Sequence, residues 1–296
     1  MVPDSKKISI VMNCYNGEDF LSQALNSVLQ QTYNNWELIF WDNCSNDGSK
    51  KILNTYNDIR IKYFKSETHT SQYEARKRAV QKCNGEFIAF LDVDDWWEKD
   101  KLSTQLALFD DPKVGFSCCN YLIINERKNL RNKSAFEKLP GGYITEDLLE
   151  KNFVGMSTLM IRKTAYDSLE YGFNPEYEII GDYDLVLRLS LKFKLASSSR
   201  ILSNYRCHDK NLSFLKFDLN ISELEKWSSN AKEFVNFKNF KYLSNFILFY
   251  RGMINILNKN RLLAFQQLKK ITNFNFRLKL IIIIFMPLWL IKKLRS

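Results

Sequence analysis

Three aspartates, Asp92, Asp94 and Asp95, directly follow the apolar run of residues 87–91 (FIAFL). Aspartates spaced this closely concentrate negative charge, which is costly unless water or a cation balances it. Oxygen-only ligands favour Mg²⁺ or Mn²⁺, and these ions typically combine one or two carboxylates with substrate phosphates. The residue types and their spacing are thus compatible with a divalent-metal site. The competing interpretation is that Asp94 and Asp95 only cap a helix that begins near Trp96.

Two further segments carry residue types that could do chemistry. Asp182 precedes an amphipathic stretch, and Asp184, close behind it, could simply complement a helix dipole. His208 is one of only two histidines and lies in residues 204–213 (NYRCHDKNLS), close to Arg206. The sequence has no GxGxxG, Walker A, HExxH or GxSxG pattern, which argues against the dinucleotide, ATPase, zinc-peptidase and hydrolase sites that those patterns mark.

The elements that must position these residues alternate along the first third of the chain. Apolar strand-like runs occupy residues 8–12, 37–41, 61–64 and 87–91, and helical periodicity occupies 20–29, 49–55 and 73–83. This alternation predicts a parallel sheet with helices on both faces. Ligands bind such sheets beyond the carboxyl ends of the strands, where Asn13, Asp42 and Asp92 all fall. Residues 114–200 are expected to continue the same domain less regularly.

Charge and composition divide the chain near Lys216. The 296 residues are 45% hydrophobic, with 10 Gly and 5 Pro, which excludes a disordered or collagen-like chain. Residues 216–296 hold 15 of the 43 Lys and Arg but only 4 of the 33 acidic residues, so the whole net charge of +10 belongs to them. They form long stretches rich in Phe and Asn, with a turn expected at 258–260. We therefore expect an α/β domain at residues 1–215 and a helical region at 216–296.

The cysteines and the first residues indicate a cytoplasmic protein. The six cysteines show no CxxC spacing and fit reduced, structural thiols. Residues 1–7 are short and polar, without the basic and apolar segments of a secretory signal.

Several motifs occur together and in order along the chain. They are residues 8–17 (ISIVMNCYNG), 30–33 (QQTY), 36–39 (WELI), 42–48 (DNCSNDG), 75–76 (AR), 85–95 (GEFIAFLDVDD) and 181–185 (GDYDL). The set resembles the family 2 glycosyltransferases, which have a GT-A fold, and the resemblance covers roughly residues 6–213. It implies transfer of a sugar, with inversion, from a nucleotide diphosphate donor to an acceptor hydroxyl. Composition and periodicity alone reach only a nucleotide- and metal-binding α/β domain.

The resemblance assigns a nucleotide pocket. Asp42 would accept a hydrogen bond from a pyrimidine base, which selects uridine or thymidine, although an Asx-turn over residues 43–48 would use the same side chain. Asn13 and Tyr15 would line this pocket. Arg76 would reach the base or the diphosphate, unless it belongs to a solvated helix face with its basic neighbours.

The resemblance also places a metal and the diphosphate. Asp92 would face the ribose, and Asp94 would hold the Mn²⁺ or Mg²⁺ that bridges the two phosphates. His208 would complete the metal shell or bind a phosphate, with Arg206 as a countercharge, unless it is a structural histidine.

By the same resemblance, Asp182 is the general base. Inversion needs a base opposite the leaving group, within hydrogen-bond reach of the acceptor hydroxyl. The sequence departs from the commonest family pattern, which has Glu where Gly181 stands. Asp184 is the next candidate.

The end of the chain is apolar with basic flanks. Residues 278–291 (LKLIIIIFMPLWLI) are short for a spanning helix, and Pro287 interrupts them. We expect residues 278–296 to lie on an anionic membrane surface, with Trp289 at the interface. The alternative is that this helix packs on the catalytic domain or against a second copy in a homo-oligomer. Nucleic acid is disfavoured as a partner because recognised motifs are missing and the basic residues alternate with long apolar runs.

These observations predict a metal-dependent, inverting glycosyltransferase with a mostly parallel GT-A sheet, peripheral on the cytoplasmic face of a membrane. The expected donor is a UDP-linked sugar, and the expected acceptor is a lipid-linked glycan such as a precursor of a bacterial surface saccharide. The rival hypothesis is a non-catalytic nucleotide-sugar-binding scaffold. Such a scaffold would lack a carboxylate at position 94 or 182, and the sequence has both.

Overall fold

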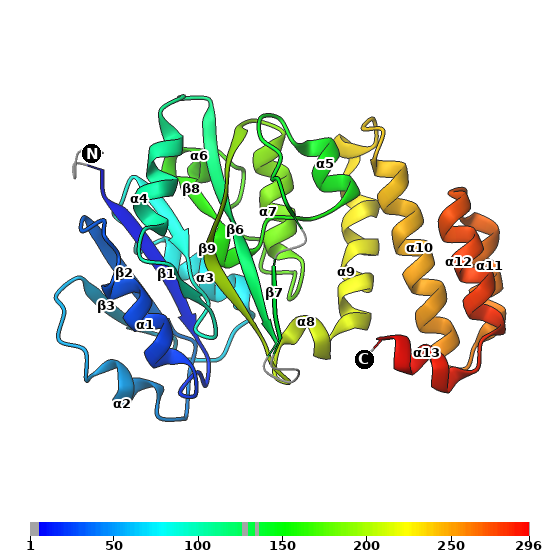
Figure 1. Ribbon diagram of the computed structural model, residues 1–296, viewed down its shortest axis with the longest axis horizontal. Helices are drawn as coiled ribbons and strands as arrows, with labels where there is room; N and C mark the ends of the chain where they lie inside the picture. The colour runs from blue at the N-terminus through cyan, green and yellow to red at the C-terminus, as the bar shows by residue number, and fades with distance from the viewer. Residues whose placement is uncertain (1–5, 126–129, 134–135, 296) are drawn as a thin grey trace. The chain divides into compact units, whose positions relative to one another are not determined.

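The computed structural model describes residues 6–125, 130–133 and 136–295 (Figure 1). The chain divides into two compact units, which we call the first and second unit. The first comprises Met1–Ile144 and Asn152–Asn211, and the second comprises Thr145–Lys151 and Leu212–Ser296. The second unit therefore takes the short helix α5 (Thr145–Glu150) from the middle of the sequence, which the charge division near Lys216 does not anticipate.

A nine-stranded sheet forms the centre of the first unit, in the order β3-β2-β1-β4-β8-β6-β9-β5, with β7 paired to β6. The strands are β1 (Ile8–Cys14), β2 (Trp36–Asp42), β3 (Ile61–Lys65), β4 (Phe87–Phe90), β5 (Trp96–Trp97), β6 (Val114–Asn125), β7 (Leu130–Lys133), β8 (Met160–Arg162) and β9 (Lys194–Cys207). β3, β2, β1 and β4 are parallel, as the alternation predicts. β8 then runs antiparallel to both β4 and β6, so the whole sheet is mixed.

The parallel half of the sheet is covered on both faces. Strands buried on both sides read as continuous apolar runs, and all seven residues of β2 are buried. Helix α1 (Leu21–Leu29) covers one face, where Leu21 and Leu25 pack into the cluster that contains Ile10. Helix α3 (Gln72–Val80) contacts β1 and β2 from the other face (Figure 1). The sheet edge that carries the strand ends is therefore rigidly supported.

The remaining helices of the first unit are α2 (Ser49–Leu53), α4 (Lys101–Leu106), α6 (Lys163–Asp167) and α7 (Gly181–Ser190). No helix begins at Trp96, which belongs to β5, so the interpretation of Asp94 and Asp95 as caps of such a helix is wrong. One residue of α4 is unusual. Lys101 is fully buried, and its Nζ lies 3.8 Å from the centroid of the Trp97 ring without a hydrogen-bond partner among the described residues.

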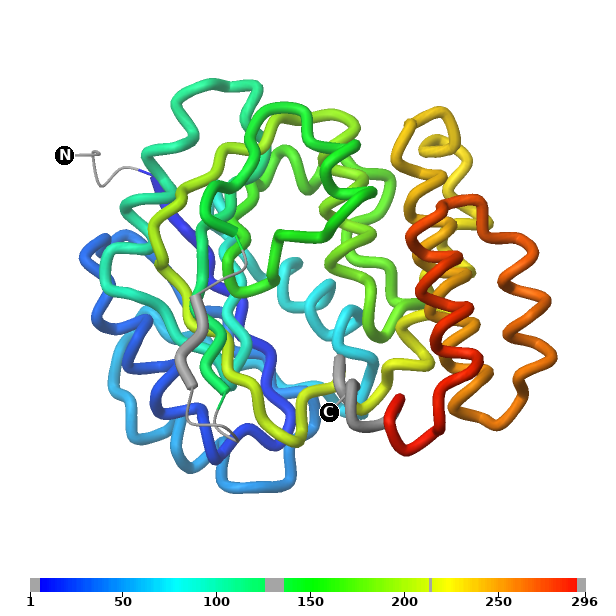
Figure 2. Tube along the Cα trace, turned by 45° about the vertical axis from the view of Figure 1, so that its right-hand side comes forward, coloured from blue at the N-terminus to red at the C-terminus, as the bar shows by residue number. Residues whose placement is uncertain are grey.

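The second unit is helical throughout its described part. Besides α5 it contains α8 (Leu212–Leu215), α9 (Phe217–Asn230), α10 (Phe240–Leu257), α11 (Arg261–Lys270), α12 (Phe274–Phe285) and α13 (Leu288–Arg295). Helices α10, α11 and α12 lie side by side (Figure 2) and share a core that includes Phe249, Ala264 and Leu280. The expected turn at 258–260 separates α10 from α11, and the break at Pro287 separates α12 from α13. Among the residues described, no helix has the length and hydropathy to cross a bilayer.

Candidate active site

The loop after β4 divides its three aspartates between two tasks. Asp95 is buried and accepts hydrogen bonds from Ser157 Oγ and, at 3.0 Å, from the backbone N–H of Arg206. Burial, followed by the charges of Asp94 and Asp92, raises the pKa of Asp95 well above its usual range. Asp92 and Asp94 stay partly exposed. Asp95 therefore anchors the loop, and the other two carboxylates remain available to a ligand.

Arg76 on α3 is the buried partner of Asp92. Its Nη2 lies 2.5 Å from Asp92 Oδ1, and only 5% of the residue is exposed. Burial opposes the charged form, but the charges of Asp92 and other acidic neighbours outweigh it and raise the pKa of Arg76. The alternative of a solvated helix face is therefore wrong for Arg76. A guanidinium fixed in this way presents a permanent positive charge beside the strand ends.

Asp182, the predicted base, lies at the start of α7 beside the Arg76–Asp92 pair. Its Oδ1 accepts hydrogen bonds from Tyr73 Oη at 3.1 Å and from the backbone N–H of Tyr183 at 2.8 Å. Oδ2 accepts none from the residues that the structure describes. Burial raises the pKa of Asp182, and the positive charge of Arg76 limits that rise. The carboxylate is thus oriented through one oxygen and more basic than an exposed aspartate.

Asp184, the second candidate for the base, has a structural task. It is buried and forms a two-point ion pair with Arg188, at 2.6 Å to Nη2 and 3.0 Å to Nε. Arg188 also donates to the carbonyl oxygens of Tyr171 and Gly172. Asp184 therefore orients Arg188, which ties α7 to the loop at residues 171–172. This ion pair would have to break before Asp184 could act as a base.

His208, beyond β9, is held against Asp94. Its Nε2 lies 3.0 Å from Asp94 Oδ2, and its ring stacks on Phe20 with 4.7 Å between centroids. The backbone N–H of Lys210 donates to Nδ1 at 3.1 Å. Because Nδ1 accepts this bond, the neutral ring carries its proton on Nε2 and donates it to Asp94. Asn211 Nδ2 also approaches the same carboxylate oxygen, at 3.5 Å.

A divalent ion could bind Asp94 as it stands, but it could bind His208 only after Nε2 loses its proton. Two neighbouring ligands of one ion, each about 2.1 Å from it, lie about 3 Å apart, which matches the separation of 3.0 Å between Asp94 and His208. Ligation through Nε2 requires that nitrogen to lose its proton, so Nδ1 would become the donor and the Lys210 contact would break. The described residues contain no cluster of three ligating side chains. Water and phosphate oxygens would have to complete the shell, as Mg²⁺ and Mn²⁺ allow.

Arg206 packs beside the loop that carries Asp94. The guanidinium lies 4.8 Å from the ring centroids of both Phe20 and Trp96, and it donates to Gln23 and to the carbonyl oxygen of Asp94. Only 8% of Arg206 is exposed. Its charge lies close to Asp94, and its donors reach helix α1 and the loop after β4.

Asp42 ends β2 with both carboxylate oxygens engaged. Oδ1 accepts the backbone N–H of Ser45 at 2.7 Å, which is the local turn that the sequence offered as an alternative, and Oδ2 accepts the hydroxyl of Tyr63 at 2.8 Å. Burial, and then the bond to Asp42, raises the pKa of Tyr63. Each oxygen has a second lone pair, so the turn and a ligand could use Asp42 together.

The other two predicted pocket residues lie at the end of β1: Asn13 belongs to the strand and Tyr15 directly follows it. Asn13 donates to the carbonyl oxygen of Gln72 at 3.1 Å, which ties β1 to the start of α3, and its Oδ1 is buried without a partner among the described residues. Tyr15 is half exposed, and its ring lies 4.0 Å from that of His69. His69 in turn bonds to the backbone of Asn43. The loops after β1 and β2 therefore meet beside Asp42.

Four polar residues that the sequence did not single out orient the predicted ones. Tyr63, Tyr73, His69 and Asn211 each bond to or stack on a predicted residue, or lie beside it. Tyr63 and Tyr73 lie in a strand and a helix whose sequence patterns are ordinary. Their hydroxyl groups were the one feature that could have suggested a role in the site. His69 carried a better signal, because the chain has only one other histidine.

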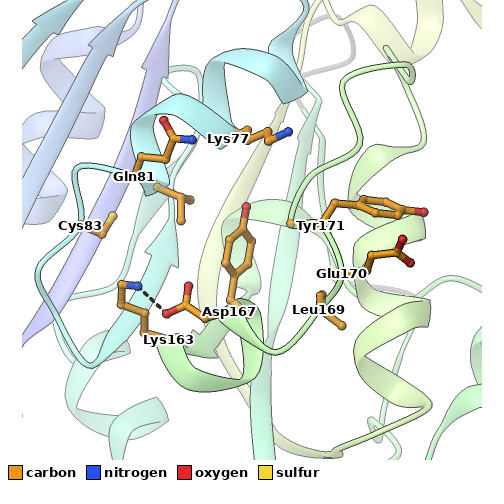
Figure 3. Close-up of a pocket in the computed structure, with 11 residues that line it drawn as sticks. Lys77, Gln81, Cys83, Lys163, Asp167, Leu169, Glu170 and Tyr171 are labelled. Carbon is orange, nitrogen blue, oxygen red and sulfur yellow. Dashed lines mark hydrogen bonds and ion pairs between the residues drawn. The ribbon is translucent and has the colours of Figure 1, made fainter.

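A separate hollow on the first unit does not coincide with this site. It holds about 350 Å³ between the end of α3, helix α6 and residues 169–172 (Figure 3). Lys163 and Asp167 in its wall form an ion pair at 2.6 Å. None of the predicted site residues lines it, so the hollow contributes no group to the site built around Asp92, Asp94 and Asp182.

Comparisons with known proteins find a matching family model and similar proteins and structures. Residues 9–169 match the family described as "Glycosyl transferase family 2". The chain is 31% identical over 252 residues to WfgD of Escherichia coli, named a UDP-Glc:alpha-D-GlcNAc-diphosphoundecaprenol beta-1,3-glucosyltransferase, covering 83% of this chain and 94% of that one. Its fold is similar to S. aureus TarS 1-349 in complex with UDP, with a TM-score of 0.63 and 19% identity over 84% of this chain and 72% of that one. It is also similar to the mannosyltransferase PcManGT of Pyrobaculum calidifontis with GDP-Man and Mn2+, with a TM-score of 0.64 and 13% identity over 90% and 74% of the two chains.

Proposed function

The chain belongs to glycosyl transferase family 2, and on this premise we propose that it transfers the sugar of a UDP-linked donor, with inversion, to a hydroxyl of a lipid-linked glycan. The name of WfgD specifies a UDP donor and a diphosphoundecaprenol acceptor, which supports a comparable step in the assembly of a bacterial surface polysaccharide. The UDP bound in the TarS structure supports the nucleotide.

One observation carries the proposal: Arg76 connects the carboxylates after β4 with the carboxylate at the start of α7. It pairs with Asp92, and its charge also acts on Asp182. The three residues come from the loop after β4, from α3 and from α7, which are separate in the sequence. A donor held at the β4 end would therefore present its reacting carbon close to a base.

Asp182 is the group that takes the proton of the acceptor hydroxyl. Its raised pKa makes it a stronger base than an exposed aspartate, and its free oxygen, Oδ2, is the one that faces no protein donor among the described residues. The acceptor oxygen then forms its bond to the anomeric carbon as the bond from that carbon to the diphosphate breaks. A positioned base of this kind contributes about 10²- to 10⁴-fold in rate.

The leaving diphosphate takes the electron pair of the broken bond. Arg76 supplies a fixed positive charge beside it, while Asp94 and, after its proton shifts, His208 would hold a divalent ion. When bound, such an ion neutralises charge that develops on the leaving group. The Mn2+ in the PcManGT structure supports this assignment.

Asp42 is the base-recognition residue of the proposal. Asn13, Tyr15 and the His69 ring beside it would enclose the nucleoside. Tyr63 and Ser45 hold the Asp42 carboxylate in place, so the remaining lone pairs can accept the N–H of a pyrimidine.

The proposal includes a peripheral position on the cytoplasmic face of a membrane, where a lipid-linked acceptor is presented. A protein that associates peripherally with a membrane needs a lipid-binding surface but no spanning helix. The apolar tail at residues 278–296 is the part that the sequence assigns to this task.

The test is a transfer assay with UDP-sugars and Mn²⁺ on the Asp182→Asn variant. We expect turnover to fall by about 10²- to 10⁴-fold while donor affinity stays within about twofold, because the base acts on the acceptor. Asp167→Asn is the matched control, since Asp167 is a partly exposed aspartate on α6. Substantial transfer by Asp182→Asn would remove Asp182 from the role of base.

A further inference from the structure

The outward face of helices α11 and α12 is apolar and exposed. We call it the outer face; its most exposed members are Leu262, Phe265, Phe274, Leu278, Ile282 and Phe285. At 100° per residue, positions 274, 278, 282 and 285 fall on one side of α12. Phe276, Leu280 and Ile284 fall on the other side and pack into the core of the second unit. The helix thus has two apolar sides, and the fold buries only one of them.

The two helices present this apolar surface as one patch. The rings of Phe265 on α11 and Phe285 on α12 lie 6.3 Å apart, and Arg261 donates to the carbonyl oxygen of Met286 at 2.9 Å. Phe274 and Phe285, at opposite ends of α12, are 74% and 71% exposed. Soluble monomers rarely expose a continuous apolar patch of this kind unless it meets a partner.

The charges around the outer face all have the same sign. Arg277 and Lys279 flank the apolar stripe of α12 on its two sides, and Lys269 and Lys270 end α11. No acidic residue follows Glu233 in the sequence. A second copy of the chain seated on this face would bring like charges together, whereas anionic lipid headgroups would pair with them.

We propose that the outer face of α11 and α12 is the surface by which the protein binds an anionic lipid bilayer. The helices lie in the plane of the interface, with Phe274 and Phe285 among the headgroups and the basic side chains on lipid phosphates. This deepens the proposed peripheral position and rests on it, but not on the sugar transfer. It moves the contact from the end of the chain, residues 278–296, to a surface that begins at Leu262. The side chains of residues 292–296 lie outside the described residues.

The test is sedimentation with vesicles of phosphatidylcholine alone or mixed with phosphatidylglycerol, at low and high salt. We expect the parent protein to bind only the anionic vesicles and to bind them more weakly in high salt. The double variant Phe274→Ser, Phe285→Ser should bind at least about tenfold more weakly, because two large apolar side chains no longer enter the interface. Lys269→Gln with Lys270→Gln should reduce binding at low salt and leave less difference between the two salts.

Matched controls distinguish binding through the outer face from nonspecific effects of exposed apolar side chains and of total charge. Ile59→Ser removes an apolar side chain that is 97% exposed on the first unit, and Lys113→Gln with Lys138→Gln removes two exposed charges there. All controls should bind vesicles like the parent. A melting curve and hydrolysis of a soluble UDP-sugar, measured on every variant, should stay unchanged.

Three results would overturn the inference: no binding of the parent to anionic vesicles, equal binding of the double phenylalanine variant, or a homodimer that these two substitutions dissociate while vesicles are ignored. If the parent binds anionic vesicles but does not hydrolyse UDP-sugars, the result would instead contradict the proposed function.

Discussion

Lys101 makes the folding stability of the first unit depend on pH in a predictable direction. Burial lowers the pKa of this lysine from 10.5 to about 7. Its Nζ faces the Trp97 ring and has no hydrogen-bond partner among the described residues. The unfolded chain therefore binds a proton between pH 7 and 10.5 that the folded chain does not. Stability is highest above the unfolded pKa and falls as the pH drops toward 7.

The variant Lys101→Met keeps the length of the side chain and removes the titrating amine. At about 1.36 kcal/mol per pKa unit, the lysine destabilises the folded state by about 3 kcal/mol at pH 8 and by about 1 kcal/mol at pH 10. The variant should therefore be more stable than the parent, and its advantage should shrink by about 2 kcal/mol between those two pH values. Packing differences between Lys and Met do not depend on pH, so this change isolates the amine.

The measurement is urea unfolding, followed by tryptophan fluorescence, of parent and variant at pH 8 and pH 10. Lys99→Met is the control, because Lys99 is exposed and close to Lys101 in the chain; its effect should be the same at both pH values. An advantage of Lys101→Met that does not change with pH would contradict the titration of Lys101, since it would mean that the buried amine keeps its proton.

Three further predictions concern single side chains. Glu37 is buried, and its pKa is lowered to about 2 because bonds from Lys62, Ser9, Asn84 and Lys7 outweigh the effect of burial. The ionised carboxylate therefore stabilises the fold fully above pH 4.5, and this stabilisation is lost as the pH falls from 4.5 toward 2. In urea unfolding, the parent should lose about 2 kcal/mol relative to Glu37→Gln between pH 6 and pH 3. Asp94→Asn should abolish the Mn²⁺ dependence of UDP binding in calorimetry, with exposed Asp111→Asn as the control, and UDP affinity that is equal with and without Mn²⁺ in the parent would contradict the metal site. His208→Gln should weaken Mn²⁺ binding by only about tenfold, because water can replace the imidazole, and an effect as large as that of Asp94→Asn would make the histidine an equal ligand.

The parallel half of the sheet was predictable because its signals are local. β1, β2 and β4 are short apolar runs closed by polar residues, and the helices between them repeat their apolar residues at helical spacing. The rule that ligands bind beyond the strand ends then brought Asn13, Asp42 and Asp92 to one edge. The antiparallel strand β8 and the transfer of α5 to the second unit had no such local signal.

The apolar pattern of the tail predicted a helix but not the surroundings of that helix. The sequence indicated an apolar helix interrupted at Pro287, and α12 does end just before it. The sequence left open whether that helix meets a membrane, the catalytic domain or a second copy of the chain. In the structure one side of the helix packs within the second unit, against α10 and α11. That side, with Leu280, meets Gly252 of α10, where an added Cβ would lie 2.7 Å from a Leu280 methyl group. The other side remains exposed.

Propensity and periodicity act over a few residues, so the sequence alone indicated which strand or helix carries each reactive residue type. Asp92, Asp94, Asp182 and His208 were candidates by their residue types, and the resemblance to the family 2 glycosyltransferases assigned their roles before their surroundings were known. Their partners came from the folded chain: Arg76 for Asp92, Tyr73 for Asp182, and Lys210 for the tautomer of His208. These pairs depend on how α3, α7 and the loop after β9 pack against the sheet, and that packing is set by the buried surface of the whole unit. Charge and hydrogen-bond state follow from those contacts, and no local pattern encodes them.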